Sequence, residues 1–194
     1  MSALLSLSRM IDALNQALGK LVSYALLLAV IICTGNALVR YAFNISSNAW
    51  LELQWYLYGA MFLGAASYTL KRDEHVRIDV IVGRFSKRTQ VIIDLLGFLF
   101  FMMPICLLIV YYSWPYALLS FESKELSTNA GGLIVWPAKM LIPFGFALLS
   151  LQGVSEIIKR AAYLMGLIDS SAFDKQQVKP EDEVAAIKAA NNLK

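Results

Sequence analysis

The sequence predicts an all-α membrane protein with four transmembrane helices. Four long apolar segments carry this prediction, at residues 21–39, 50–70, 91–112 and 133–154. Each has about the 20 residues that a helix rising about 1.5 Å per residue needs to cross about 30 Å of hydrocarbon. These segments are apolar all round, whereas a helix of a soluble domain keeps a polar face. At 58% hydrophobic residues, the chain has room for one small bundle and no sizeable soluble domain.

Residues 1–20 predict an amphipathic helix that lies in the membrane interface before the first span. Apolar residues recur there at helical spacing, at Leu4, Leu7, Ile11, Leu14 and Leu18. Polar and charged residues occupy the remaining positions, which is typical of an interfacial helix. An ordinary helix packed on a partner is the open alternative.

The positive charges predict that both termini and the middle loop lie in the cytoplasm. Of the 17 Lys and Arg residues, all but Arg40, Lys124 and Lys139 precede the first span, separate the second from the third, or follow the fourth. Lys and Arg accumulate on the cytoplasmic side of membrane proteins. All four tryptophans lie near the opposite ends of the spans, where aromatic belts form. The net charge of +3 therefore reports topology and requires no nucleic-acid partner.

The segments between the spans are short. The outer loops cover about residues 41–49 and 113–132, and the middle loop covers 71–90. We expect a short in-plane helix in the middle loop, because an isolated strand edge at a membrane surface is unfavourable. Ser86 is placed to cap the third helix. We assign residues 1–165 to the transmembrane domain and 166–194 to a polar cytoplasmic tail.

Residues that carry chemistry are missing from the centres of the spans. No Asp, Glu, Lys, Arg or His lies there, although such residues usually mark ion paths in membranes. Cys33 and Cys106 match no metal-ligand spacing. The single histidine, His75, lies in the middle loop and cannot form a bis-histidine haem site. The sequence thus predicts no enzyme, no metal site and no cofactor in this chain.

Two features predict helix packing instead. Ala60 and Gly64 form a small-xxx-small pair in the second span, which lets helix backbones approach closely in lipid. Arg40 and Glu52 flank one short outer loop at similar depth, so an ion pair between the first two helices is one interpretation. Two side chains that extend separately to the interface are the other.

These landmarks resemble a known family. Arg40-Tyr41-x-Phe43, Trp50-x-Glu52, Gly64-Ala65-Ala66 and His75-x3-Asp79, arranged on four spans, resemble the small membrane subunit of tripartite ATP-independent periplasmic (TRAP) transporters. This subunit is the DctQ-like, or Q, component. The resemblance covers roughly residues 10–165. Many members have a second acidic residue after the glutamate of Trp-x-Glu, where this chain has Leu53.

The resemblance implies a function that composition does not show. A Q subunit pairs as a heterodimer with a large permease subunit, M, which carries the substrate and sodium sites. Both lie in the bacterial inner membrane and receive an organic acid from a periplasmic binding protein, P. The small subunit then enlarges the static, non-conducting scaffold of a sodium-coupled symporter. The alternative from another class is a cofactor-free membrane anchor of an enzyme complex.

Site residues follow from the same expectation. His75 and Asp79 are assigned to structure and subunit contact, because at i,i+4 on a helix a carboxylate orients an imidazole. Solvated loop residues are the alternative. Glu122, Lys124 and Glu125 are charges on an otherwise depleted side, so we expect the second outer loop to help dock the binding protein.

Overall fold

The computed structural model describes residues 2–45, 47–72 and 84–169, whose regular elements are all helical. They are α1 (Ser2–Phe43), α2 (Asn48–Lys71), α4 (Lys87–Gly97), the π-helical η1 (Phe98–Met102), α5 (Met103–Glu122) and α6 (Trp136–Leu164). Because α4, η1 and α5 follow one another without a break, the described chain forms four long helices. The expected in-plane helix of the middle loop and most of the tail lie outside the described residues.

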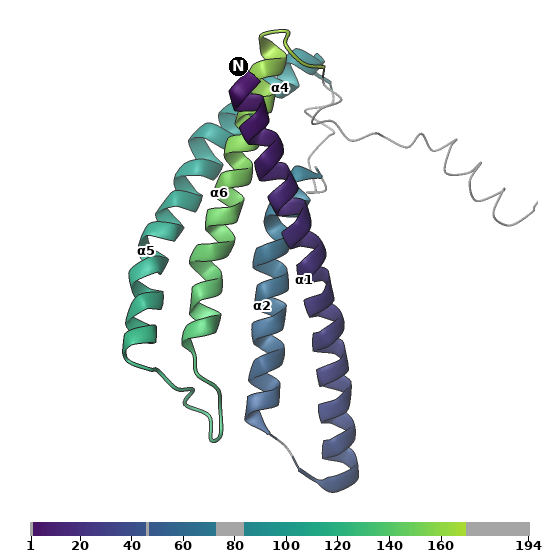
Figure 1. Cartoon of the computed structure of the whole chain (residues 1–194), viewed down its shortest axis with the longest axis vertical. Helices are drawn as coiled ribbons and strands as arrows, with labels where there is room; N and C mark the ends of the chain where they lie inside the picture. Colours follow the sequence, from purple (N-terminus) through teal and green to yellow (C-terminus); the bar gives the residue numbers. More distant parts are fainter. Residues whose placement is uncertain (1, 46, 73–83, 170–194) are drawn as a thin grey trace, which may run out of the picture.

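The four helices form a layer rather than a closed bundle. α2 packs between α1 and α6, and α5 packs on the other side of α6 (Figure 1). The N-terminal part of α1 crosses onto α6. The start of α1, the start of α4 and the end of α6 share one end of the layer, which we call the inner end. The connections after α1 and α5 lie at the opposite, outer end.

Three of these helices are long and apolar enough to span a membrane. They are the segments Ala3–Phe43, Lys87–Glu122 and Trp136–Leu164. α2 has the length, since its 24 residues rise about 36 Å. Its composition is more polar, and Glu52, Gln54 and Ser67 are buried. Its position between α1 and α6 explains this difference, because less of its surface faces lipid. The fourth span therefore stays a prediction.

The first helix differs from the sequence prediction. α1 is one helix of 42 residues, about 63 Å long, with no break near residue 20. The prediction of a separate interfacial helix is not confirmed. The polar face of residues 2–20 packs on α6, as bonds between Ser8 and Ser155 and between Asn15 and Gln152 show. Those polar side chains have partners within the chain, which is why the segment continues the span.

The third long helix, which consists of α4, η1 and α5, has a capped start and a π-helical turn. Ser86 caps its start, and the Ser86 Oγ accepts a hydrogen bond from the Thr89 backbone N–H at 3.4 Å, which confirms the predicted cap. The π-helical turn η1 comes just before Pro104, which lacks a backbone N–H. In Figure 1 the helix passes behind α6 at the inner end and then descends beside it.

Glycines bring neighbouring helices into close contact. A Cβ placed on Gly64 of α2 would lie 3.0 Å from a methyl group of Val22 in α1. A Cβ on Gly145 of α6 would lie 2.6 Å from the Cβ of Leu63 in α2. The distance at Gly145 leaves no room for a Cβ unless the helices separate, and the distance at Gly64 is tight enough that Val22 would have to move. The packing of α2 therefore depends on these small residues.

We predict that Gly145→Ala destabilises the protein by about 1–3 kcal/mol, because overpacking forces α2 and α6 apart. Gly35→Ala is the matched control, since a Cβ there meets nothing within 4 Å. Thermal unfolding of both variants in one detergent measures the difference. Equal midpoints for the two variants would contradict the close α2–α6 contact.

Candidate functional site

The carboxylate of Glu52 holds a loop 75 residues or more away in sequence. Its side chain is 4% exposed and accepts a hydrogen bond from the Ser127 Oγ. It also accepts bonds from the Asn129 Nδ2 at 2.8 Å and from the Leu133 backbone N–H at 2.6 Å. A buried carboxylate costs free energy unless hydrogen bonds compensate for lost water, and these three bonds do so.

Two further residues of α2 bind the same loop. The Asn48 Nδ2 donates to the carbonyl of Ala130 at 2.9 Å, and the Tyr56 hydroxyl donates to the carbonyl of Ile134 at 3.1 Å. Asn48, Glu52 and Tyr56 are spaced four residues apart and therefore lie on one face of the helix. We call these three residues the outer anchor.

The bound loop, residues 123–135, is itself a compact hairpin. Leu126 and Ile134 form a bridge, and the Ser127 backbone N–H donates to the Leu133 carbonyl at 3.0 Å. A Cβ on Gly132 would lie 2.6 Å from the Cβ of Ser127, so only glycine lets the hairpin close against Glu52. We call residues 123–135 the outer hairpin.

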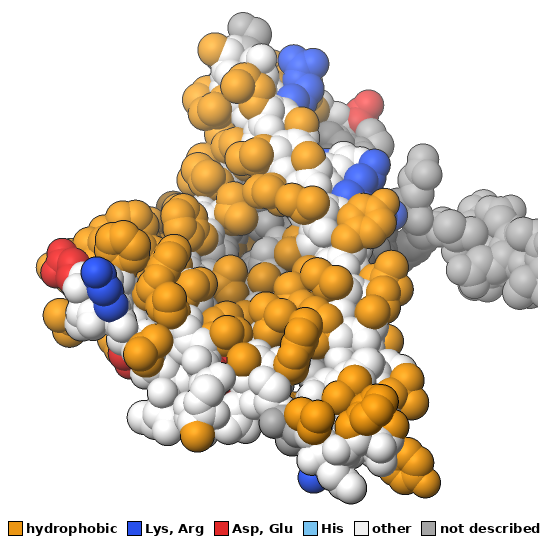
Figure 2. Space-filling model, turned by 60° about the horizontal axis from the view of Figure 1, so that its bottom comes forward, with side chains coloured by type: hydrophobic (Ala, Val, Ile, Leu, Met, Phe, Trp, Pro, Cys, Tyr) orange, Lys and Arg blue, Asp and Glu red, His pale blue; other side chains and the backbone are white. Residues whose placement is uncertain are grey.

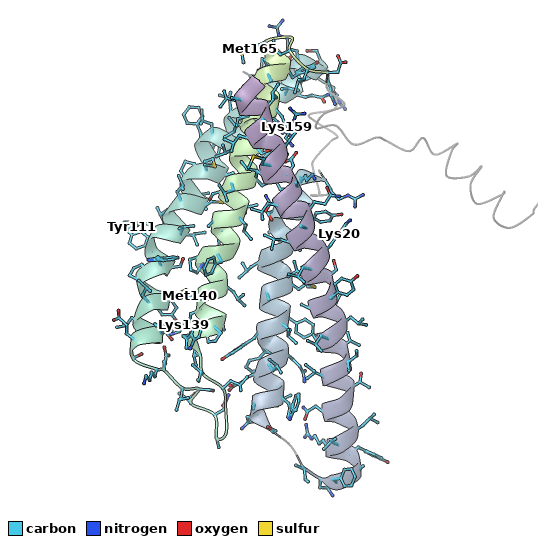
Figure 3. All side chains as sticks on the ribbon, in the orientation of Figure 1. Lys20, Tyr111, Lys139, Met140, Lys159 and Met165 are labelled. Atoms are coloured by element: carbon cyan, nitrogen blue, oxygen red, sulfur yellow. The ribbon has the colours of Figure 1, made fainter. Side chains whose placement is uncertain are left out.

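The three predicted docking residues differ in their surroundings. Glu122 and Lys124 are exposed at the outer end. Glu125 forms an ion pair with Lys139 of α6, whose ammonium also lies 4.1 Å from the ring centroid of Tyr116 (Figure 3). The hydrogen bond from Lys139 lowers the pKa of Glu125 below its ordinary value. Glu125 therefore stabilises the base of the hairpin.

Of the two interpretations of Arg40 and Glu52, the ion pair is not the one observed. Glu52 faces the outer hairpin, whereas Arg40 lines a groove on the other side of the α1–α2 contact together with Asn36. Similar depth in the membrane was not sufficient to predict the pair, because the two side chains leave their helices in different directions.

A second polar group joins α1, α4 and α6 at the inner end. Its side chains are Ser8, Asp12 and Asn15 of α1, Asp94 of α4, and Gln152, Ser155, Glu156, Lys159 and Arg160 of α6. We call these residues the inner polar cluster. The Asp12 carboxylate accepts hydrogen bonds from Ser155 at 2.8 Å, from Gln152 at 2.9 Å and from Lys159 at 3.2 Å.

Glu156 is the centre of the inner polar cluster. Its side chain is 2% exposed and pairs with Lys159 and with Arg160, each at 2.5 Å. The guanidinium of Arg160 lies 3.4 Å from the carboxylate of Asp94 and 4.6 Å from the ring centroid of Phe98. Lys159, which is labelled in Figure 3, marks the position of the cluster. The charges compensate one another, which lets them stay buried. This arrangement fastens three helices.

The inner polar cluster was missed from the sequence, although a signal existed. Ser8, Asp12 and Asn15 recur at helical spacing and were assigned to the water-facing side of an interfacial helix. Gln152 and Glu156 recur in the same way on α6. Two polar stripes of matching length on helices with a common end indicate a contact between them.

The remaining predicted residues give a mixed picture. Gly64 lies against Val22, and Ala60 is half-buried in α2. His75 and Asp79 lie outside the described residues. Within the described ranges no group of three or more His, Cys, Asp or Glu side chains is placed to hold a metal ion.

The sequence left two classes of protein open, a small subunit of a TRAP transporter and a membrane anchor of an enzyme complex. The comparison with protein families decides between them. Residues 17–162 match the family described as tripartite ATP-independent periplasmic transporters, DctQ component. The chain belongs to the DctQ family. No curated protein and no solved structure matches it.

Family membership makes this chain a transporter component, and DctQ is not an enzyme family. The matched range contains the outer anchor, the outer hairpin and the α6 side of the inner polar cluster. Ser8, Asp12 and Asn15 precede it, so the α1 side of that cluster is a feature of this DctQ chain that the family match does not cover.

We predict that Glu156→Gln lowers the stability of this DctQ chain by about 3 kcal/mol, because it leaves Lys159 and Arg160 without their shared anion. Glu122→Gln makes the same chemical change at an exposed position and should change stability by less than about 0.5 kcal/mol. Unfolding in detergent, followed by circular dichroism, compares them. Similar losses for both variants would rule out a special role for Glu156.

We also predict that Glu52→Ala releases the outer hairpin while the helices remain folded. The hydrogen-bond donors of Ser127, Asn129 and Leu133 would lose their shared acceptor. Amide hydrogen exchange should accelerate at least about tenfold in residues 123–135 and stay unchanged in α5 and α6. Unchanged protection of the hairpin would show that its own backbone bonds suffice.

Proposed function

We propose that this DctQ chain is the non-conducting scaffold subunit of a sodium-coupled TRAP transporter in a bacterial inner membrane. It pairs with the large permease subunit, which carries the substrate and sodium sites, and the complex imports an organic acid delivered by a periplasmic binding protein. The charge asymmetry of the loops supports a topology with both termini in the cytoplasm and the outer hairpin in the periplasm.

The observation that carries this proposal is the placement of the charges. The buried charged side chains of the described chain gather at the inner end and bind one another, and Glu52 at the outer end binds the hairpin. Between these ends the predicted spans contain no Asp, Glu, Lys, Arg or His. An ion-coupled path usually requires such ligands near the midplane. The chain therefore supplies structure, and its partner supplies the ion path.

The shape of the molecule supports pairing with a large subunit. A layer one helix thick has two broad faces, and only 6% of the most apolar windows of α1 and of the α4–α5 helix is buried. Figure 2 shows hydrophobic side chains over most of the visible surface, with charged side chains toward its edges. Such a surface suits lipid and another membrane protein.

Reconstitution tests the proposal. In liposomes with an inward sodium gradient and the cognate binding protein outside, the chain alone should accumulate no organic acid, whereas co-reconstitution with the large subunit should give uptake. The large subunit without this chain is the matched control. Sodium-dependent uptake by the pure small subunit would refute the scaffold function.

We further propose that the outer hairpin contributes to the docking of the binding protein. It is held rigidly by the outer anchor, and Glu122 and Lys124 project at its base without an ion pair among the described residues. Exposed charges at the rim of an interface act mainly on the encounter rate and its salt dependence. A receptor that must release its carrier after each cycle requires a weak contact of this kind.

Charge reversal at Glu122 and, in a separate variant, at Lys124 changes the local charge by two units each time and should change uptake roughly threefold or more at limiting binding protein and low salt, and less at high salt. Glu125 is left intact because it pairs with Lys139. Arg88→Glu, an exposed charge reversal at the inner end, is the control. Uptake equal to that of the parent at every ionic strength would exclude these two residues from docking.

A further inference from the structure

A polar groove opens between α1 and α2 near the outer end. It has a volume of about 580 Å³ and is lined by Asn36, Arg40 and Asn44 from the α1 side and by Gln54 of α2. Asn36 and Arg40 are four residues apart and share one face of α1, and Asn44 follows directly after the helix ends at Phe43. The outer third of α1 thus presents polar groups sideways, toward the membrane.

The polar side chains of this groove have no partners in the described part of the chain. Gln54 is 6% exposed, and its Nε2 makes no hydrogen bond there. The side chains of Asn36, Arg40 and Asn44 make none either, in contrast to the outer anchor a short distance along α2. An unpaired donor at membrane depth costs free energy, as at the buried Gln54 Nε2, and a ligand with acceptor atoms would recover it.

The donors lie at two depths. Arg40 is three residues from the end of α1 at Phe43, and Asn36 lies one helical turn, about 6 Å, deeper. Trp50 and Trp55, which are 51% and 64% exposed, mark the headgroup level at this end. A phospholipid presents acceptors in the same order, with its phosphate at the headgroup level and its ester carbonyls one step deeper.

The surface below the groove suits acyl chains. The face of α1 that carries Ala37 of the groove continues toward the membrane centre. At helical spacing it presents Cys33, Val30 and Leu26. Leu26 and Val30 are 42% and 49% exposed. The polar groove and this apolar strip together form an amphipathic surface with its charged part at the outer end.

We propose that this groove binds one glycerophospholipid of the outer leaflet. The Arg40 guanidinium holds the phosphate through two hydrogen bonds, a geometry that arginine and phosphate share. The amides of Asn36 and Gln54 donate to the ester carbonyls, and the acyl chains lie along Leu26 and Val30. This site is distinct from the docking surface of the outer hairpin and belongs to the small subunit alone.

The position favours a lipid over a carboxylate from a partner helix. A single carboxylate satisfies Arg40 and leaves the deeper amides without acceptors, whereas a phospholipid serves both levels. The groove is also open to the side, where phospholipids surround the helix in every membrane. A partner helix remains one outcome that the experiment distinguishes.

Native mass spectrometry of the purified full-length chain tests the proposal. The delipidated protein is titrated with phosphatidylglycerol and, separately, with a diacylglycerol of the same acyl chains, which lacks the phosphate. We expect tight binding of one phosphatidylglycerol and at least tenfold weaker binding of diacylglycerol. Arg40→Gln should weaken phosphatidylglycerol binding about tenfold. Lys124→Gln, which removes the exposed cation of the outer hairpin, should leave it unchanged.

Two further variants keep the result interpretable. Gln54→Leu should weaken both lipids if its amide binds the ester carbonyls, and Arg40→Lys should retain part of the preference for phosphate. Equal binding of diacylglycerol and phosphatidylglycerol would overturn the proposal. It would also be overturned if Arg40→Gln kept full lipid binding but lost recovery of the large subunit, because Arg40 would then bind a protein partner.

Discussion

Helices in a membrane gain little from burying apolar side chains against one another, because lipid is equally apolar. This protein therefore depends on polar bonds and close backbone contacts to hold its layer together. Glu52 binds the outer hairpin at one end, and Glu156 gathers Lys159 and Arg160 at the other. Between them, Gly64 and Gly145 let α2 approach both of its neighbours. Two carboxylates at opposite ends thus fix the positions of the helices.

The layer explains the composition of each helix. α2 lies between two neighbours and carries buried polar residues, and it lacks an apolar stretch of the kind that the other three long helices have. α1 and the α4–α5 helix lie at the edges, and their most apolar stretches are almost wholly unburied within the chain. A soluble protein would cover such faces, whereas a subunit of a membrane complex presents them to lipid and to its partner.

The all-helical fold, the order of the long helices and the Ser86 cap follow from the sequence because period, length and capping are local properties. The sequence left the Arg40–Glu52 pair open because residues at equal depth on two helices need not face each other. The inner polar cluster was missed because its α1 members lie more than 130 residues from their partners on α6, as with Asn15 and Gln152. The same polar stripe on residues 2–20 fits water and a neighbouring helix equally well, and only the position of α6 decides between them. Tertiary placement of one helix against another was the information that local patterns lacked.

The departure of this chain from the common family pattern has a structural explanation in the outer anchor. Asn48, Glu52 and Tyr56 lie on one face of α2, and that face supplies the side-chain bonds from α2 to the outer hairpin. Residue 53 lies about 100° around the helix from residue 52, so a second carboxylate there would face away from the hairpin. Leu53 at this position therefore removes no hydrogen bond of the outer anchor. A single carboxylate, with both oxygens used, is sufficient to hold the loop that faces the periplasm in the proposed topology.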